Sequence, residues 1–158
     1  MVVIAKSVRF TNFKCNSLDL EFSTFSECSL KMIRRNVVGL NMTCHLHKAP
    51  VNNVSVNFSI YKKSNGYVPF MLNVSTDFCK FTKNRDRQPL FKILAEFLLR
   101  NTNINHSCPF DHDLIARNLV LDPKLFNYLP LQTGDYMFKI MVAAYNDWKA
   151  DVNLFFKV

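Results

Sequence analysis

The sequence predicts an all-β protein: a two-sheet immunoglobulin-like sandwich or β-cup of about eight antiparallel strands, with one helix near residues 89–100. Three observations support this fold class: short stretches in which apolar and polar residues alternate, turn signals between those stretches, and one stretch with helical periodicity. The chain has 158 residues, of which 49% are hydrophobic and 20% charged, enough apolar material for one core. We therefore expect residues 1–158 to form a single domain.

The strand pattern recurs along most of the chain. Apolar side chains take every second position in residues 38–46 and again in residues 54–60, as in strands with one face on the core. Two turn signals, Ser64-Asn65-Gly66 and Asn146-Asp147, each join two neighbouring strands into a hairpin. The strands are predicted at residues 7–15, 26–34, 37–47, 53–62, 67–74, 113–120, 135–145 and 150–158.

One helix is predicted between the fifth and sixth strands. Pro89 suits the first turn of a helix, and the polar residues that follow, Lys92, Glu96 and Arg100, recur every four positions. Nearly all other residues of this stretch are apolar, so the helix needs cover on most sides. Plain core packing, which the pattern favours, or one wall of an apolar cavity would provide that cover.

Asn-x-Ser/Thr sequons suggest a secreted glycoprotein. They occur at Asn41, Asn53, Asn57, Asn73 and Asn105. The first three lie on the polar phase of alternating stretches, so we expect the glycan acceptors to point away from the core. Ordinary polar residues on solvated strand faces are the alternative. Residues 1–5 are too short for the apolar region of a signal peptide, so secretion requires a trimmed or incomplete N-terminus, and unused sequons in a cytosolic protein are the alternative.

Five cysteines point to two disulfides and one free thiol. There is no C-x-x-C and no zinc-finger spacing. Cys44 lies on the inward phase of its strand, where a free thiol behaves as a small hydrophobe, so we expect it to be unpaired. The other four allow three connectivities, of which we favour the local one, Cys15 with Cys28 and Cys79 with Cys108.

The formal charge of +8 does not by itself indicate a nucleic-acid partner. The clusters of basic residues are Lys31, Arg34 and Arg35, and Lys80, Lys83, Arg85 and Arg87. Neither cluster alternates with aromatic residues that could stack on bases, so we expect no nucleic-acid binding. A basic rim for acidic head groups and plain solubility are the remaining explanations. No apolar run approaches the roughly 18 residues of a transmembrane helix.

No catalytic set can be recognised. The chain has three glycines and contains neither a phosphate-binding loop nor a G-x-S-x-G turn. The densest polar group is His106, Cys108, Asp111, His112 and Asp113, but without a Cys108 thiolate its spacing matches no common zinc template. His45 and His47 share a strand face, where solvated side chains are the simpler explanation than a metal site. We therefore predict no enzymatic activity, no metal and no cofactor.

Phenylalanine is abundant, with 15 residues, and so many flat apolar side chains suit a site for an acyl chain or sterol. A filled core would need the same residues. From the phase of the strands and the helix, the predicted cavity lining is Phe58, Ile60, Phe70, Leu94, Phe97, Phe138, Ile140 and Phe156.

Several segments jointly resemble a known family. They are Arg9-Phe-Thr-Asn-Phe-Lys-Cys15, Cys28-Ser-Leu-Lys31, Asn65-Gly-Tyr-Val-Pro-Phe70, Asp77-Phe-Cys-Lys-Phe81, Asn103-Ile-Asn-His-Ser-Cys-Pro-Phe110 and Leu129-Pro-Leu-Gln-Thr-Gly-Asp-Tyr136. Together they are similar to a large insect family of small secreted proteins with a domain of unknown function, related to the ML lipid-recognition domains and compared with the ganglioside activator protein. The chain departs from that family in lacking the usual signal peptide and in having an additional cysteine, Cys44.

The resemblance implies a β-sandwich or β-cup with a hydrophobic cavity, disulfides among Cys15, Cys28, Cys79 and Cys108, and no enzymatic activity. It also implies an extracellular protein that binds a lipid or other apolar small molecule. A chemosensory role in pheromone or hydrocarbon perception and a membrane receptor as a second partner follow by the same analogy. The alternative is an extracellular interaction module with a filled core and no small-molecule ligand.

Overall fold

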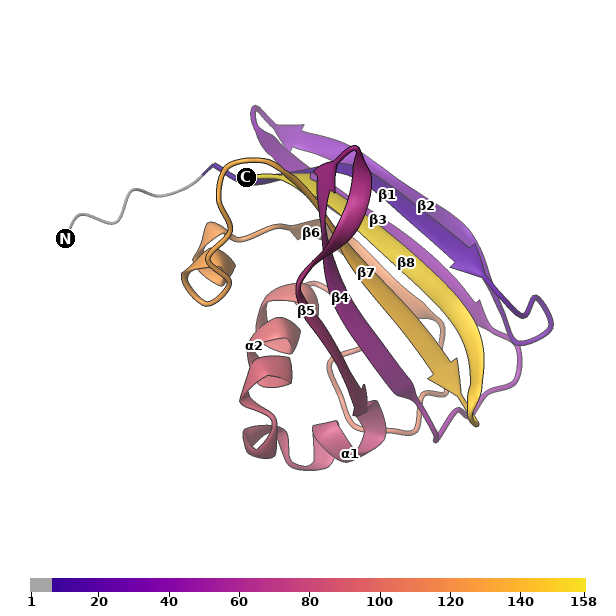
Figure 1. The fold of residues 1–158 in the computed structure, drawn as a ribbon. Coiled ribbons are helices and arrows are strands. Elements are labelled where there is room, and N and C mark those ends of the chain that lie inside the picture. The colour runs from indigo at the N-terminus through magenta and orange to yellow at the C-terminus, as the bar shows by residue number, and fades with distance from the viewer. Residues whose placement is uncertain (1–6) are drawn as a thin grey trace.

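The computed structural model describes residues 7–158 as two antiparallel sheets packed face to face (Figure 1). The larger sheet has the order β1-β8-β7-β4-β5 and the smaller one β2-β3-β6. The strands are β1 (Arg9–Ser17), β2 (Ser23–Arg34), β3 (Val37–Leu46), β4 (Ser55–Ser64), β5 (Gly66–Asp77), β6 (Leu114–Val120), β7 (Asp135–Ala144) and β8 (Asp147–Lys157). This confirms the predicted all-β sandwich. The expectation about residues 1–5 lies outside the described residues.

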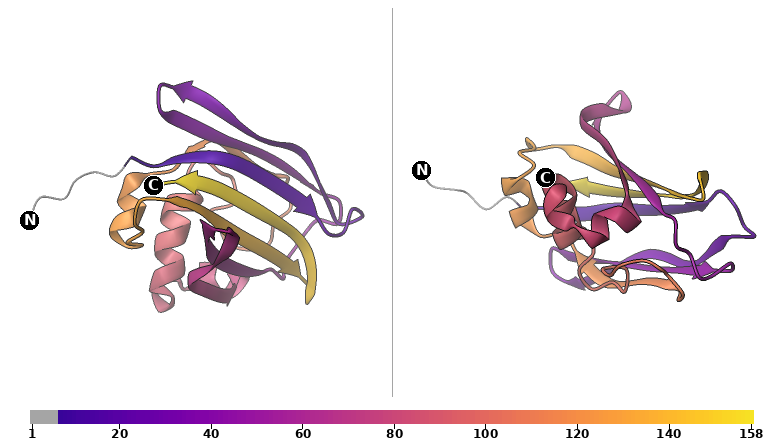
Figure 2. Two further views of the ribbon diagram at one scale, coloured as in Figure 1. Left: turned by 45° about the horizontal axis from the view of Figure 1, so that its top comes forward. Right: turned by 90° about the horizontal axis from the view of Figure 1, so that it is seen from below.

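Short helical elements lie at one side of the two sheets, which Figure 2 (right) shows as separate layers. They are α1 (Phe78–Lys83), α2 (Pro89–Leu98) and the 3-10 helices η1 (Arg85–Arg87) and η2 (Pro123–Asn127). Pro89 starts α2, as the sequence predicts. The sequence pattern did not indicate α1, which Asp77 caps by accepting a hydrogen bond from the Lys80 backbone N–H (3.0 Å).

Both predicted hairpins form. Ser64 pairs with Gly66, whose φ of +93° lies in the left-handed region that favours glycine. At the β7–β8 turn the two central residues are Tyr145 and Asn146, with φ of 52° and 62°. Two consecutive left-handed residues are what a tight two-residue hairpin turn requires, so the turn begins one residue earlier than the Asn-Asp signal indicates.

Disulfides secure the two edges of the sandwich differently. Cys15 on β1 is bonded to Cys28 on β2, which joins the two sheets along one edge. On the other side, residues 99–113, which we call the cover segment, run from α2 to β6, and the Cys79–Cys108 bond ties this segment to α1. Both pairings are the local ones predicted, and Cys44 is free and buried, as expected.

The strand β5 is a free edge of the larger sheet and is irregular. It contains Pro69, and its exposed Met71 has a φ of 67°, unusual for a residue with a side chain. The pairing register with β4 shifts between Ser59 and Tyr61, close to these two residues. The edge strand is therefore interrupted near its middle.

Candidate functional site

An apolar cavity of about 250 Å³ lies between the sheets. Both sheets, both α-helices and the cover segment contribute to its wall. In the described part of the chain, Ser23, Thr102 and Lys149 are the wall residues that carry a hydroxyl or a charge. A space of this kind, enclosed by several elements and lined by apolar side chains, is typical of a binding site for an apolar ligand.

Strand alternation creates most of the wall. On β3 the lining residues are Leu40, Met42, Cys44 and Leu46, which are the inward-phase positions of the sequence. Strands β4, β7 and β8 each contribute every second residue in the same way. These strand residues are Val56 and Phe58, Ile140, Val142 and Ala144, and Ala150, Val152 and Leu154.

The helical side of the cavity is closed by aromatic and aliphatic side chains. Phe78 and Phe81 come from α1, with ring centroids 5.9 Å apart, and Phe110 of the cover segment lies 6.0 Å from Phe78. A pair of backbone hydrogen bonds, each 2.8 Å, joins Phe110 to Val51 and holds the segment against the strand side. The Cys79–Cys108 bond thus links two of the elements that close the cavity.

The polar groups on the wall are satisfied by the protein itself. Thr102 Oγ1 donates to the carbonyl oxygen of Leu99 (2.7 Å), and the Cys44 thiol is hydrogen-bonded with Ser23. Burial raises the pKa of the Cys44 thiol to about 11, so it remains neutral at physiological pH. In residues 7–158 no buried side-chain nitrogen or oxygen lacks a hydrogen-bond partner. A ligand inside the cavity therefore meets apolar surface and no free polar group.

Lys149 is the charged residue on the described cavity wall, and its side chain retains 13% exposure. Its Nζ lies 2.8 Å from Asp19 Oδ2, 3.1 Å from Asp147 Oδ2 and 4.7 Å from the ring centre of Phe22. The hydrogen bond to Asp19 raises the pKa of Lys149 and lowers that of Asp19, so both groups are charged. The charge of Lys149 is thus balanced by carboxylates of the protein itself.

Of the eight predicted lining residues, Phe58, Leu94 and Ile140 lie on the cavity wall. Phe70 is half-buried, 6.0 Å from the ring of Tyr136. The other four, Ile60, Phe97, Phe138 and Phe156, are buried in the solid part of the core and are absent from the wall.

These residues miss the cavity wall because of their position along the strands. Phe138 and Phe156 have ring centroids 4.4 Å apart, and Ile60 pairs directly with Phe138, so this half of the sandwich is filled. Strand phase predicts which face a residue occupies, but not which half of the sandwich it lies in. The aromatic wall residues of α1 were missed because the pattern gave no helix there.

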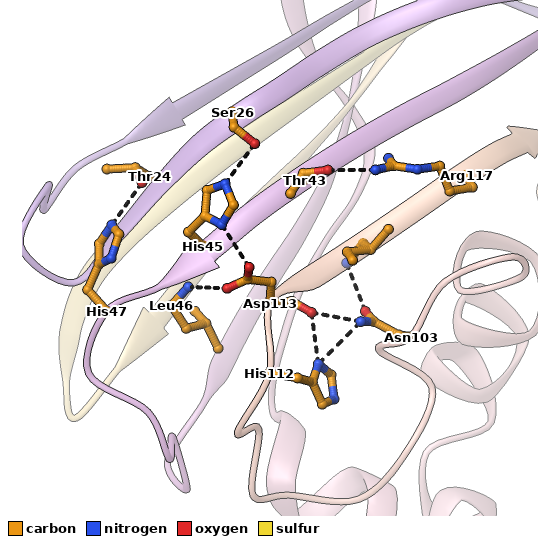
Figure 3. Close-up of polar contacts among 11 residues, drawn as sticks. Thr24, Ser26, Thr43, His45, Leu46, His47, Asn103, His112, Asp113 and Arg117 are labelled. Carbon is orange, nitrogen blue, oxygen red and sulfur yellow. Dashed lines mark hydrogen bonds and ion pairs between the residues drawn. The ribbon is translucent and has the colours of Figure 1, made fainter.

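A chain of polar contacts crosses the outer face of the smaller sheet (Figure 3). Ser26 Oγ lies 2.8 Å from His45 Nε2, and His45 Nδ1 lies 2.7 Å from Asp113 Oδ2. The other oxygen of Asp113 accepts a hydrogen bond from the Leu46 backbone N–H (3.3 Å). The hydrogen bond from His45 lowers the pKa of Asp113. His47 makes a separate contact, between its Nε2 and Thr24 Oγ1 (2.8 Å).

This order of serine, histidine and aspartate is that of serine hydrolases. Cys44 and Leu46, the neighbours of His45 on β3, line the cavity, so His45 itself points to the opposite face of the sheet. The exposed Ser26 hydroxyl therefore cannot reach a ligand inside the cavity. These contacts hold Asp113, the last residue of the cover segment, against β3.

The predicted glycan acceptors differ in accessibility. Asn53, Asn73 and Asn105 are exposed. Asn41 is buried, and its Oδ1 accepts a hydrogen bond from the Asn118 backbone N–H (3.1 Å), so it is not accessible to a glycan even though its neighbours Leu40 and Met42 take the inward phase. A register shift between Leu40 and Met42 in the β3–β6 pairing places Asn41 against β6.

Asn57 is half-buried, unlike the exposed acceptors on either side of it in the chain. Its Nδ2 donates to Asn73 Oδ1 and to Ser75 Oγ, both at 2.8 Å. The nitrogen that would carry a glycan is therefore already engaged in hydrogen bonds on this face of the larger sheet.

A family model described as protein of unknown function (DUF1091) matches residues 56–138, more than half of the chain. The matched region begins in β4, includes both α-helices, the cover segment and β6, and ends within β7. No curated protein matches the chain. Among the described residues, no helix has the length and apolar character needed to cross a membrane.

Proposed function

The chain belongs to the family described as protein of unknown function (DUF1091), and we propose that this member is a secreted protein that binds lipids or other apolar ligands. The cavity between the sheets is the binding site in this proposal. The observation that carries it is the cavity of about 250 Å³ whose polar wall groups are all engaged within the protein. A filled core, in contrast, contains few voids larger than a water molecule.

The cavity volume sets the size of the ligand. An apolar cavity of about 150 Å³ takes up a six-carbon ring, so this one has room for roughly ten carbon atoms by simple scaling. Burying ten methylene groups yields about 8 kcal/mol before the cost of ordering the ligand. Affinity would therefore come from an apolar chain, with any polar head group next to Lys149.

Several finer features of the proposal rest on resemblance and composition. Two disulfides are typical of proteins from oxidising compartments, which supports secretion. Asn53, Asn73 and Asn105 are the sequons accessible enough to carry glycans. A relation to ML lipid-recognition domains, an insect origin and a chemosensory role in pheromone or hydrocarbon perception are proposed by analogy with the family that the sequence resembles.

Native mass spectrometry tests the proposal directly. Protein secreted from insect cells behind a supplied signal peptide is measured before and after denaturation and deglycosylation. A mass lost on denaturation, of the size expected for a ligand of roughly ten carbon atoms, would support a bound apolar ligand and begin to identify it. Its absence, with the disulfides intact, would favour the interaction module with no small-molecule ligand.

Cys44 offers a second test, because a free thiol lies on the cavity wall. The rate at which a small maleimide modifies Cys44 is measured with and without decan-1-ol, with Cys44→Ala as the blank. We expect decan-1-ol to slow the reaction, since it occupies the space next to the thiol. Decane-1,10-diol is the matched control ligand, because it must bury a hydroxyl without a partner at a cost of about 1–3 kcal/mol. Equal protection by both compounds, or by neither, would contradict an apolar binding site.

A further inference from the structure

Two histidines of the cover segment face each other. His106 Nε2 and His112 Nε2 are 2.7 Å apart. Phe110, which lines the cavity, lies beside them, with its ring centroid 4.6 Å from that of His106 and 6.1 Å from that of His112. Both histidines are half-buried, so one side of the pair is open to water.

The hydrogen bonds of the other ring nitrogens fix which nitrogen of each histidine is free. His106 Nδ1 lies 2.7 Å from the carbonyl oxygen of Ser107, and His112 Nδ1 lies 2.8 Å from that of Asp113 (Figure 3 shows the second contact). A carbonyl oxygen only accepts hydrogen bonds, so each Nδ1 carries a hydrogen. Asn103 Nδ2 donates to the same Asp113 oxygen (2.7 Å) and lies farther, 3.3 Å, from His112 Nδ1, so we assign the His112 tautomer from the shorter contact of Nδ1 with the carbonyl oxygen. The two Nε2 lone pairs therefore point at each other.

We propose that His106 and His112 form a binding site for a divalent transition-metal ion that prefers imidazole ligands, Zn²⁺ or Cu²⁺. Two facing lone pairs repel unless a positive species lies between them. Histidines that bind metals almost always donate their other ring N–H to a carbonyl or carboxylate, which both of these residues do. Imidazole nitrogen suits zinc and copper, whereas magnesium and calcium prefer oxygen ligands.

The site has two protein ligands and requires a small adjustment. At a metal–nitrogen distance of about 2.0–2.1 Å and tetrahedral geometry, the two Nε2 atoms would lie about 3.3 Å apart. The rings therefore separate by several tenths of an ångström, which a surface segment can accommodate. Within residues 7–158 no group of three or more histidine, cysteine or acidic side chains is placed to hold a metal, so water completes the coordination. Two acidic residues flank His112 in sequence: the Asp113 carboxylate is held by His45, and Asp111 is exposed.

A metal ion here would brace the cover segment on the flank of Phe110. This inference does not depend on the proposed ligand, because the two imidazoles lie outside the cavity wall. It adds to the Cys79–Cys108 bond, the Phe110–Val51 backbone hydrogen bonds and the His45–Asp113 contact. A bound metal stabilises the folded state in proportion to the logarithm of its concentration above Kd.

Isothermal titration of chelator-treated protein with ZnCl₂ tests the proposal, with MgCl₂ as the comparison. We expect one Zn²⁺ per chain, no heat from Mg²⁺, and at least a tenfold weaker affinity in His106→Gln and in His112→Gln. His47→Gln is the matched control, because His47 is another surface histidine with a single hydroxyl partner, and it should bind as the unchanged protein does.

A second measurement on the unchanged protein avoids any folding defect of the variants. Diethyl pyrocarbonate modifies accessible imidazoles, and mass spectrometry maps which ones react. Zn²⁺ should protect His106 and His112 while leaving His47 reactive. The proposal is overturned if millimolar Zn²⁺ produces no binding heat, as for a pair that shares only a proton, or if the two glutamine variants bind Zn²⁺ as tightly as His47→Gln does.

Discussion

Filling part of the cavity should change the length of the ligand that the protein accepts. Ala116 on β6 is 3% exposed and lines the cavity wall. Ala116→Leu places three more carbon atoms in this space. Burying them is worth up to about 2.4 kcal/mol, so we expect the free energy of unfolding to rise by about 1–2 kcal/mol after some strain.

The three added carbon atoms occupy space that the ligand would otherwise fill. A ten-carbon chain would bury about three methylene groups fewer, which corresponds to about 2.4 kcal/mol and a Kd roughly 50-fold higher. A seven-carbon chain should still fit, so its Kd should hardly change. The assay is displacement of a fluorescent apolar probe by 1-alkanols of six to twelve carbons, together with urea unfolding of each variant.

Ala143→Leu is the matched control. Ala143 is also buried, but its neighbours Val142 and Ala144 line the cavity, so Ala143 points to the other face of the larger sheet. This variant should keep the chain-length preference of the unchanged protein and gain no stability. The reasoning is refuted if Ala116→Leu and Ala143→Leu show the same preference, or if Ala116→Leu loses stability while binding decan-1-ol unchanged.

Three further expectations concern stability and modification. Replacing Cys79 and Cys108 by alanine removes a cross-link between residues 29 apart, which should cost about 3.6 kcal/mol in urea unfolding under oxidising conditions; no loss would show that the cover segment holds without it. The pKa of Cys44 is about 11 in the folded protein against an ordinary value of 9.0. The neutral thiol therefore contributes fully to the free energy of unfolding below pH 9, and this contribution is lost as the pH rises towards 11. The free energy of unfolding should fall by about 3 kcal/mol more than in Cys44→Ala over that interval, and parallel pH profiles would contradict this. Asn73→Gln should lower the glycoprotein mass by one glycan, whereas Asn41→Gln should leave it unchanged because Asn41 is buried; intact-mass spectrometry distinguishes the two.

The sequence predicted the strands, and it favoured the disulfide pairing that forms while leaving three connectivities open. Alternation in residues 38–46 and 54–60 follows directly from one buried sheet face, and Cys44 takes its inward place in that pattern. Helix α1 was not predictable in the same way, because six residues give too little periodicity and only the Asp77 cap signals its start. Asn41 is buried although it lies on the polar phase, because its side chain is hydrogen-bonded to β6 at a register shift, which depends on the partner strand.

The candidate sites were predicted less completely, for two reasons. The cavity lies in one half of the sandwich, and the position of a void along paired strands depends on how all facing side chains fill the space, as Phe138 and Phe156 do in the other half. The sequence also showed His106 and His112 to be close along the chain, but the contact between their Nε2 atoms depends on backbone carbonyls that no side-chain pattern reveals. Local spacing identified the candidates, and tertiary structure decided their geometry.

The interruption of β5 has a consequence for how copies of the protein meet in solution. A regular free edge of a sheet presents a row of unpaired N–H and C=O groups on which a second chain can add a strand and begin a fibril. Pro69 has no N–H to offer, and the left-handed backbone at Met71 turns the neighbouring groups out of line. The β5 edge of the larger sheet is therefore a poor template, and concentrated protein is expected to resist aggregation through this strand.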